Sequence, residues 1–175
     1  MIIMINGAFG VGKTSVATEL VKEINHSMLY DPEEVGFMLR NILPPPIQQR
    51  EAVTGDFQDF KLWKELTVSV AASLKDTYNM DLVVPMTICN PQYFEYIKRG
   101  FTKIDPQTFH FCLTASKKTI YDRLLERGEE EENWCFQQTD RCLESFSTHD
   151  FSQYVETDDR GISEVVKVIK GNLKS

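Results

Sequence analysis

The chain begins MIIMINGAFGVGKTSVATEL, residues 1–20, and this stretch decides the fold. Its apolar run over residues 1–5 predicts a strand buried on both faces of a parallel sheet, because such strands are continuously apolar rather than alternating. Residues 7–14, GAFGVGKT, match the phosphate-binding pattern G-x-x-x-x-G-K-[ST], at the turn from that strand into a helix over 14–21. The stretch therefore predicts a P-loop fold that binds a nucleoside triphosphate.

The residue types of this loop explain how it would hold phosphate and magnesium. Glycines let several backbone N–H groups point at one anion, and the start of the helix adds the positive end of its dipole. We expect the Lys13 ammonium to reach the β- and γ-phosphates and the Thr14 hydroxyl to coordinate Mg²⁺. The expected cofactors are ATP and Mg²⁺, bound by Gly7, Ala8, Phe9, Gly10, Val11, Gly12, Lys13, Thr14 and Ser15.

Length and composition narrow the class of protein. A chain of 175 residues fits one domain, and we expect a single P-loop domain over residues 1–175. Its net charge of −7, without a basic stripe, predicts no nucleic-acid partner. No signal peptide precedes the loop, and no apolar run approaches the roughly 20 residues of a membrane span, which predicts a cytoplasmic protein. The four cysteines lack C-x-x-C spacing and are expected to be free thiols.

Strand-like runs alternate with helical patterns along the chain. This alternation predicts an α/β fold, with a parallel sheet and helices on both of its faces. Asp56 is expected to cap a long helix with an apolar stripe from Phe57 to Tyr78. The prolines at 44–46 are expected to form a turn or an extended link, because proline cannot continue a helix. The five expected strands are Met1–Asn6, Ser27–Tyr30, Leu82–Met86, Thr108–Leu113 and Gln153–Glu156.

One carboxylate directly follows the second expected strand. Asp31 would lie at the carboxyl edge of the sheet, where open parallel sheets bind ligands. In small-molecule kinases an acid there accepts the proton of the attacking hydroxyl or binds the acceptor. Asp31-Pro32 also suits an ordinary cap for a helix over 33–42, and the two interpretations are compatible. The third expected strand, in contrast, ends in Pro85-Met86-Thr87 without an acid.

Two expected helices in the second half of the chain carry arginines. Ser116 is expected to cap a helix over 117–127, which places Arg123 and Arg127 four residues apart on one face. The next helix carries Arg141. Guanidinium groups match the charge that spreads over a transferring phosphoryl group, so these arginines are candidates for contacting the triphosphate. Ordinary surface salt bridges with nearby glutamates are the alternative.

An acidic run, residues 129–132, separates these two helices. We expect it to form a solvated turn after Gly128, which reads as a helix stop. The arginines on either side then predict a small helical lid over residues 123–145 that closes over the triphosphate.

Five segments resemble, in order, the tunicamycin-resistance ATP-binding proteins of bacteria. They are GAFGVGKT (7–14), YDPEEVGFMLR (30–40), VVPMTICNPQYF (83–94), ASKKTIYDRLLERGE (115–129) and NWCFQQTDRC (133–142). The resemblance implies a kinase-like P-loop fold related to nucleoside monophosphate kinases, with a five-stranded parallel sheet and a helical lid. It also implies resistance to tunicamycin, a uridine-containing lipidated antibiotic, through ATP-dependent phosphorylation or binding of the drug.

The resemblance also implies roles for particular residues. Catalysis would involve Lys13, Asp31, Arg123 and Arg127, and the two arginines would also contact ATP. The acceptor would be bound by Asp31, Gly36, Phe37, Arg40 and Arg141. Members of this family often continue past the last helix, whereas this chain ends at Ser175, so no membrane association through a carboxyl tail is expected.

Two other functions remain open. A metabolic kinase for a nucleotide, sugar or coenzyme precursor would use the same machinery on a smaller acceptor. A nucleotide-dependent sequestering protein would bind without transfer chemistry, and the missing acid after the third strand keeps this alternative open. In each case the expected partner is a small molecule, either tunicamycin-like or nucleotide-like. Residues 157–161 are a candidate base-contact loop, but they do not decide between adenine and guanine.

Overall fold

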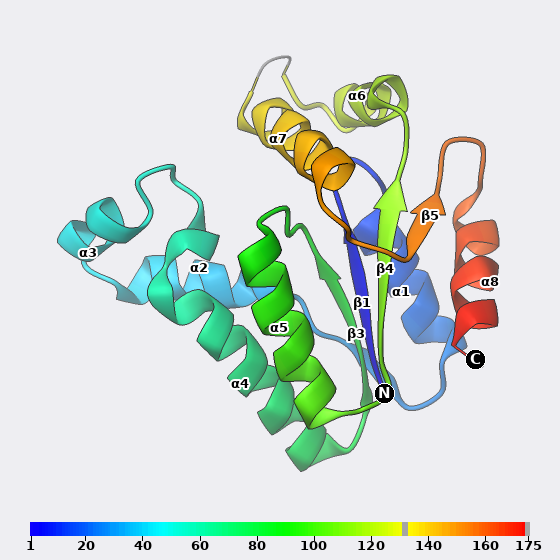
Figure 1. Ribbon diagram of the computed structural model, residues 1–175, viewed down its shortest axis with the longest axis horizontal. Coiled ribbons are helices and arrows are strands. Elements are labelled where there is room, and N and C mark those ends of the chain that lie inside the picture. Colours follow the sequence, from blue (N-terminus) through cyan, green and yellow to red (C-terminus); the bar gives the residue numbers. More distant parts are fainter. Residues whose placement is uncertain (131–132, 174–175) are drawn as a thin grey trace.

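The computed structural model describes residues 1–130 and 133–173, which form a parallel sheet with helices on both faces (Figure 1). Its five strands have the order β2-β3-β1-β4-β5, so the order reverses at β1. This arrangement confirms the predicted α/β P-loop fold class. The strands are β1 (Ile2–Gly7), β2 (Ser27–Leu29), β3 (Asp81–Met86), β4 (Thr108–Thr114) and β5 (Tyr154–Glu156). The helices are α1 (Lys13–Glu23), α2 (Pro32–Ile42), α3 (Pro45–Glu51), the 3₁₀ turn η1 (Phe57–Asp59), α4 (Lys61–Tyr78), α5 (Pro91–Ile104), α6 (Lys117–Glu126), α7 (Trp134–Thr148) and α8 (Ile162–Asn172).

β1 is buried along its whole length because both of its faces are covered. Ile2 and Met4 belong to one apolar core, which residues of α4 and α5 complete. Ile3 and Ile5 belong to a second core, which residues of α1 and α8 complete. Figure 1 shows these two pairs of helices on opposite sides of the sheet. The two cores explain why residues 1–5 are continuously apolar.

Pro85 lies inside β3, which has neighbours on both sides, and it interrupts no ladder hydrogen bond. The Leu82 N–H donates to the Met1 carbonyl (3.1 Å) on the β1 side, whereas the Val83 carbonyl accepts from the Tyr30 N–H (2.9 Å) on the β2 side. Because successive residues alternate between the two neighbours, the Pro85 nitrogen faces the β2 side. The pairing of β2 with β3 ends at Val83, two residues before Pro85, so the position of the missing N–H lies outside the β2 ladder.

Two expected elements differ from the structure. Asp56 does not cap a long helix: its carboxylate accepts from the Gln58 N–H (2.9 Å) and caps η1, and α4 begins only at Lys61. Pro45 and Pro46 do not form an extended link but are the first two residues of α3. Proline is tolerated there because the first N–H groups of a helix have no partner within the helix.

α6 and α7 lie beyond the carboxyl ends of β1 and β4, at the top of Figure 1. Ser116 caps α6 as predicted, since its hydroxyl accepts from the Thr119 N–H at 3.2 Å. Gly128, with a φ of 82°, follows the end of this helix. Residues 131 and 132 of the expected acidic turn lie outside the described residues. The lid over 123–145 stays a prediction.

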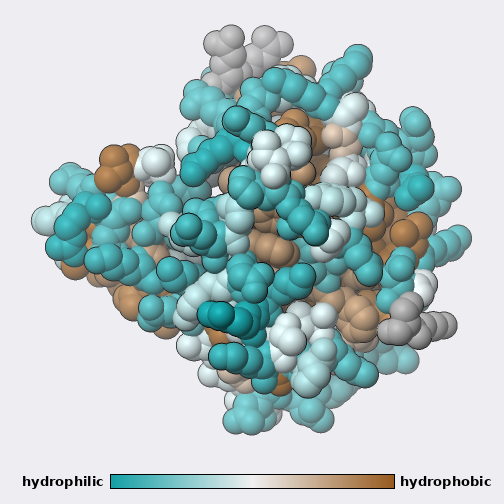
Figure 2. Space-filling model, viewed as in Figure 1, coloured by the Kyte–Doolittle hydropathy of each residue, from teal (hydrophilic) through white to brown (hydrophobic). Residues whose placement is uncertain are grey.

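The face seen in Figure 2 is largely hydrophilic, but apolar residues reach the surface on the projection formed by α2, α3 and the loop that follows them. Ile42 is 63% exposed and Val53 is 81% exposed. Within the part of the chain that the structure describes, no helix combines the length and the apolar character needed to span a membrane.

Candidate active site

The P-loop, residues 7–14, joins β1 to α1 where the strand order of the sheet reverses. Open parallel sheets bind ligands at such a point. A Cβ on Gly7 would lie 2.7 Å from the Leu113 carbonyl oxygen, so no larger residue fits there. Gly12, the residue before α1, has a φ of 104°, which also requires glycine. Two glycines thus fix a loop that wraps closely around the N-terminus of a helix, where anions bind.

Lys13 extends back across the loop that it follows. Its Nζ donates to the Ala8 carbonyl at 2.8 Å and lies 5.5 Å from the centre of the Phe9 ring. The residue is only 9% exposed, and this burial lowers its pKa to about 8, an effect that the carboxylate of Glu33 partly opposes. Within the described residues no carboxylate forms a salt bridge with this ammonium. An incoming phosphate would supply the counter-charge that the buried lysine lacks.

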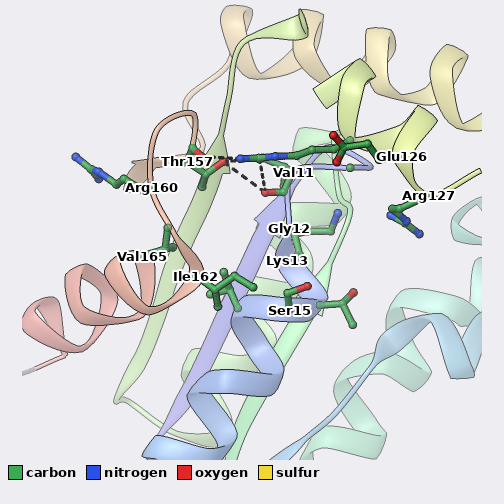
Figure 3. Close-up of a pocket in the computed structure, with 14 residues that line it drawn as sticks. Val11, Gly12, Lys13, Ser15, Glu126, Arg127, Thr157, Arg160, Ile162 and Val165 are labelled. Atoms are coloured by element: carbon green, nitrogen blue, oxygen red, sulfur yellow. Dashed lines mark hydrogen bonds between the residues drawn. The ribbon is translucent and has the colours of Figure 1, made fainter. Parts of the chain in front are cut away.

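A cavity of about 570 Å³ opens over the loop and the start of α1 (Figure 3). We call it the basic cavity because four basic side chains line it, and among the described residues Glu126 is the one carboxylate on its wall. Lys13 comes from α1, Arg123 and Arg127 come from α6 and the residue after it, and Arg160 comes from the loop between β5 and α8. Figure 3 shows Arg127 and Arg160 on opposite sides of the loop. Segments far apart in the chain therefore concentrate positive charge at the P-loop.

The Arg123 guanidinium forms hydrogen bonds with two neighbouring loops. It donates to the Val11 carbonyl at 3.3 Å, to the Thr157 carbonyl at 2.7 Å and to the Thr157 hydroxyl at 3.1 Å. These bonds are among the dashed lines in Figure 3. Arg123 thus joins α6 to the P-loop and to the loop after β5, whereas Arg127 is exposed at the basic cavity.

A second cavity, of about 360 Å³, shares no lining residue with the basic cavity. We call it the aromatic cavity because two edge-to-face ring pairs line it. The rings of Phe9 and Trp134 are 5.3 Å apart, and those of Phe37 and Phe57 are 5.7 Å apart. Phe9 belongs to the P-loop, so the loop contributes to both cavities. The other lining residues are Glu33, Arg40, Thr54, Gly55, Asp56, Gln58, Thr87, Cys89, Gln138 and Cys142.

Most residues predicted to bind the nucleotide surround the basic cavity. Gly7 and Ala8 lie at the base of the loop, and Ala8 accepts the Lys13 hydrogen bond. Phe9, predicted to bind ATP, lines the aromatic cavity instead. The predicted residues that line the basic cavity are Gly10, Val11, Gly12, Lys13, Thr14, Ser15, Arg123 and Arg127.

The residues predicted to bind the acceptor are dispersed. Phe37 and Arg40 line the aromatic cavity, but Asp31 and Gly36 line neither cavity. The Asp31 carboxylate accepts from the Glu33 N–H at 2.9 Å and caps α2.

Gly36 packs behind the wall of the aromatic cavity, where a Cβ would lie 2.2 Å from the Phe57 ring. Arg141 lines a separate surface cavity that neither Arg123 nor Arg127 lines, beside Asn90 and Glu144.

Two carboxylates of the aromatic cavity, Glu33 and Asp56, were missed as site residues. Burial raises the pKa of Glu33. The charges of Asp31 and Asp56 raise this pKa further, whereas the charge of Lys13 lowers it. Burial likewise raises the pKa of Asp56, against the hydrogen bond from the Gln58 N–H. Glu33 could have been found, because it lies two residues after Asp31 in the same segment. The sequence around Asp56 indicated only a helix cap and no site residue.

The donor set of the basic cavity fits a nucleoside triphosphate with magnesium. Backbone N–H groups of the loop and the Lys13 ammonium suit phosphate oxygens. The hydroxyl-bearing residues Thr14 and Ser15 line the same cavity. Mg²⁺ takes few protein ligands and completes its shell with phosphate oxygens and water, so a hydroxyl at this position suits it.

Comparison with protein families agrees with the P-loop and the sheet topology. The family described as AAA domain matches residues 3–150, which include the P-loop, α6 and α7. The chain belongs to this family. A comparison with curated proteins found no match.

Solved structures extend the comparison. This AAA domain is similar to the tunicamycin resistance protein of Deinococcus radiodurans, with a TM-score of 0.79 and 27% identity over 98% of this chain and 94% of that one. It also has the fold of a gluconokinase from Sinorhizobium meliloti 1021 (TM-score 0.64, 16% identity, 98% and 90% covered) and of a shikimate kinase from Bacteroides thetaiotaomicron (0.62, 15%, 100% and 99%). The predicted resemblance to tunicamycin-resistance proteins is confirmed. Together these similarities support a nucleotide-binding, kinase-like function.

Proposed function

We propose that this protein transfers the γ-phosphoryl group of ATP to a hydroxyl of a small molecule, and that the acceptor is tunicamycin or a similar uridine-containing compound. The observation that carries the proposal is the junction of the two cavities at the P-loop. Phe9 of the loop lines the aromatic cavity, while the next seven residues, 10–16, line the basic cavity. A donor in one cavity and an acceptor in the other would meet beside Lys13.

In this proposal the loop N–H groups and Lys13 bind the β- and γ-phosphates, and Arg127 reaches the phosphates from the end of α6. Mg²⁺, held by the Thr14 hydroxyl and phosphate oxygens, would neutralise part of the phosphate charge. Arg123 joins α6 to the loop through Val11 and Thr157, so we expect its replacement to displace Arg127 as well. Residues 123–145 act as the lid, with Arg141 on the acceptor side.

We assign the proton transfer to Glu33 and a positioning role to Asp31. The acceptor oxygen forms a bond to the γ-phosphorus, its proton passes to the Glu33 carboxylate, and the bond to the β-phosphate oxygen breaks to release ADP. Burial raises the pKa of Glu33, which strengthens it as a base. Asp31 holds the first turn of α2, and with it Glu33, through the cap at 2.9 Å.

The tunicamycin assignment rests on the similarity to the Deinococcus radiodurans protein, which at 27% identity covers nearly the whole chain. Growth of a tunicamycin-sensitive bacterium that expresses the chain is the direct test. We expect protection by the wild-type protein, and none by Lys13→Met at equal expression. If Lys13→Met protects as well as the wild type, the protein sequesters the drug without using ATP, and the proposed reaction is wrong.

A further inference from the structure

We infer that the aromatic cavity selects an uncharged, ring-bearing acceptor and rejects acids, and that Asp56 is the residue that sets this selection. The inference rests on the proposed function insofar as it takes the aromatic cavity to be the acceptor site.

The two cavities have opposite electrostatic character. Among the described residues, the basic cavity presents four cationic side chains against one carboxylate, as expected for a triphosphate. The aromatic cavity presents two carboxylates, Glu33 and Asp56, against the single guanidinium of Arg40. An acceptor that carried its own carboxylate or phosphate would therefore bring a third negative charge into this site.

Arg40 is already engaged by other groups. Its guanidinium donates to the Gly55 carbonyl and lies 5.1 Å from the centre of the Phe57 ring. Both partners are themselves on the wall of the aromatic cavity. Arg40 is therefore held along the wall by one hydrogen bond and one ring contact, and its single positive charge is the only one that the described lining sets against the two carboxylates.

Asp56 and Glu33 are partly removed from water, and the charge of Asp56 disfavours the charged form of Glu33. Burial raises the pKa of both carboxyl groups, and Asp56 contributes to the rise at Glu33. The positive charges of Arg141 and Arg40 act on Asp56 in the opposite direction, but they rank below burial. Adding a further anion strengthens the repulsion, because a partly buried site screens charge less than water does.

The remaining wall suits a neutral ring with hydroxyl or amide groups. Two edge-to-face ring pairs, Phe9 with Trp134 and Phe37 with Phe57, offer apolar surface for a flat ligand. The Gln58 amide nitrogen donates to the Thr87 carbonyl at 2.7 Å, which leaves its amide oxygen available to a donor. A sugar ring or a nucleoside without ionised groups matches this combination.

Asp56→Asn isolates the charge of this side chain. Asparagine is as good an N-cap as aspartate, so the hydrogen bond to the Gln58 N–H and the turn η1 are retained. Asp59→Asn is the matched control: it removes one charge from the same turn, but the Asp59 carboxylate accepts from Thr54 and Tyr93 and does not line the aromatic cavity. Because Asp59 raises the pKa of Asp56, its removal leaves Asp56 at least as charged as in the wild type.

The probes are pairs that keep the ring and differ by a carboxylate: uridine with orotidine, and glucose with glucuronate. Binding is measured by calorimetry with a non-hydrolysable ATP analogue and Mg²⁺ present, so that the basic cavity is filled and cannot bind the acid. We expect wild-type protein and Asp59→Asn to bind the neutral member of at least one pair about tenfold more tightly than the acid. Asp56→Asn should reduce that preference about tenfold by improving the acid.

The inference is overturned if the acid binds as tightly as the neutral member, if no neutral probe binds, or if Asp56→Asn and Asp59→Asn change the preference equally. A thermal melt and circular dichroism of both variants show that each is folded. Failure of the proposed function has a different signature: selective binding of the neutral probe, reduced by Asp56→Asn, without phosphoryl transfer when ATP replaces the analogue.

Discussion

The buried ammonium of Lys13 makes nucleotide affinity depend on pH in the weakly alkaline range. Its pKa is lowered to about 8 because the side chain is buried. A bound phosphate favours the charged form and raises this pKa. Nucleotide binding is therefore linked to proton uptake: affinity is constant while Lys13 is protonated and falls as the pH rises above about 8.

The size of this effect follows from the pKa. At about pH 7 roughly nine-tenths of the free protein carries the charged lysine, and at about pH 9 roughly one-tenth does. If only the charged form binds, the dissociation constant for ATP should increase about tenfold between these values, or about 1.4 kcal/mol. The phosphates themselves do not contribute, since their last pKa lies near 6.

Titration of a fluorescent ATP analogue at a series of pH values measures this change. Calorimetry in buffers of different ionisation enthalpy should show uptake of about half a proton per nucleotide at pH near 8. Lys13→Arg is the matched control, because arginine stays charged over the whole range and should abolish the slope. A wild-type affinity that stays constant from about pH 7 to about pH 9 would show that the charge of Lys13 does not control nucleotide binding, as would an equal slope in Lys13→Arg.

Three further predictions concern stability and reactivity. Gly36→Ala should lower the free energy of unfolding by about 1–3 kcal/mol in urea titrations, because its Cβ would lie 2.2 Å from Phe57; Phe57→Leu in the same chain should restore part of the loss. Cys89 should react fastest of the four cysteines with iodoacetamide, at a rate that rises through neutral pH, because the hydrogen bond with Cys142 lowers its pKa to about 7; identical rates for all four, measured by mass spectrometry, would contradict this. Burial alone would raise the pKa of Asp105, but Lys75, 2.8 Å away, and the terminal amine hold it at about 2, below the unfolded value of 3.8. This ion pair therefore stabilises the fold above about pH 4 and is lost as the pH falls toward 2, so Lys75→Met should flatten the acid limb of a pH–stability curve.

The sequence predicted the parts of the fold that depend on local pattern. The strand before the P-loop can be recognised from its own residues, because a strand that is buried on both faces is apolar at every position. Ser116 was predicted as a cap because a serine directly before a helical pattern is also a local signal. The prediction for the prolines at 45 and 46 was wrong, because the first turn of a helix tolerates proline although the helix interior does not.

The site was harder to predict because its members meet only in three dimensions. Asp31 was chosen for its place at the end of a strand, but which carboxylate faces a cavity depends on how α2 is turned, and the structure turns Glu33 toward it. Asp56, the residue before η1, also lines that cavity. No local sequence pattern specifies how the loop before η1 folds back to it. Phe9 was assigned to the nucleotide with the rest of its loop, yet its ring packs against Trp134 of α7, far away in the chain.

Phosphoryl transfer from ATP to an acceptor in the aromatic cavity is the step on which the proposed function depends. Incubation with γ-labelled ATP, Mg²⁺ and tunicamycin, followed by chromatography of the drug, tests it most directly. We expect label in the drug with the wild-type protein, and none with Lys13→Met or Glu33→Gln. Drug that is bound but recovered without label would contradict phosphoryl transfer to tunicamycin.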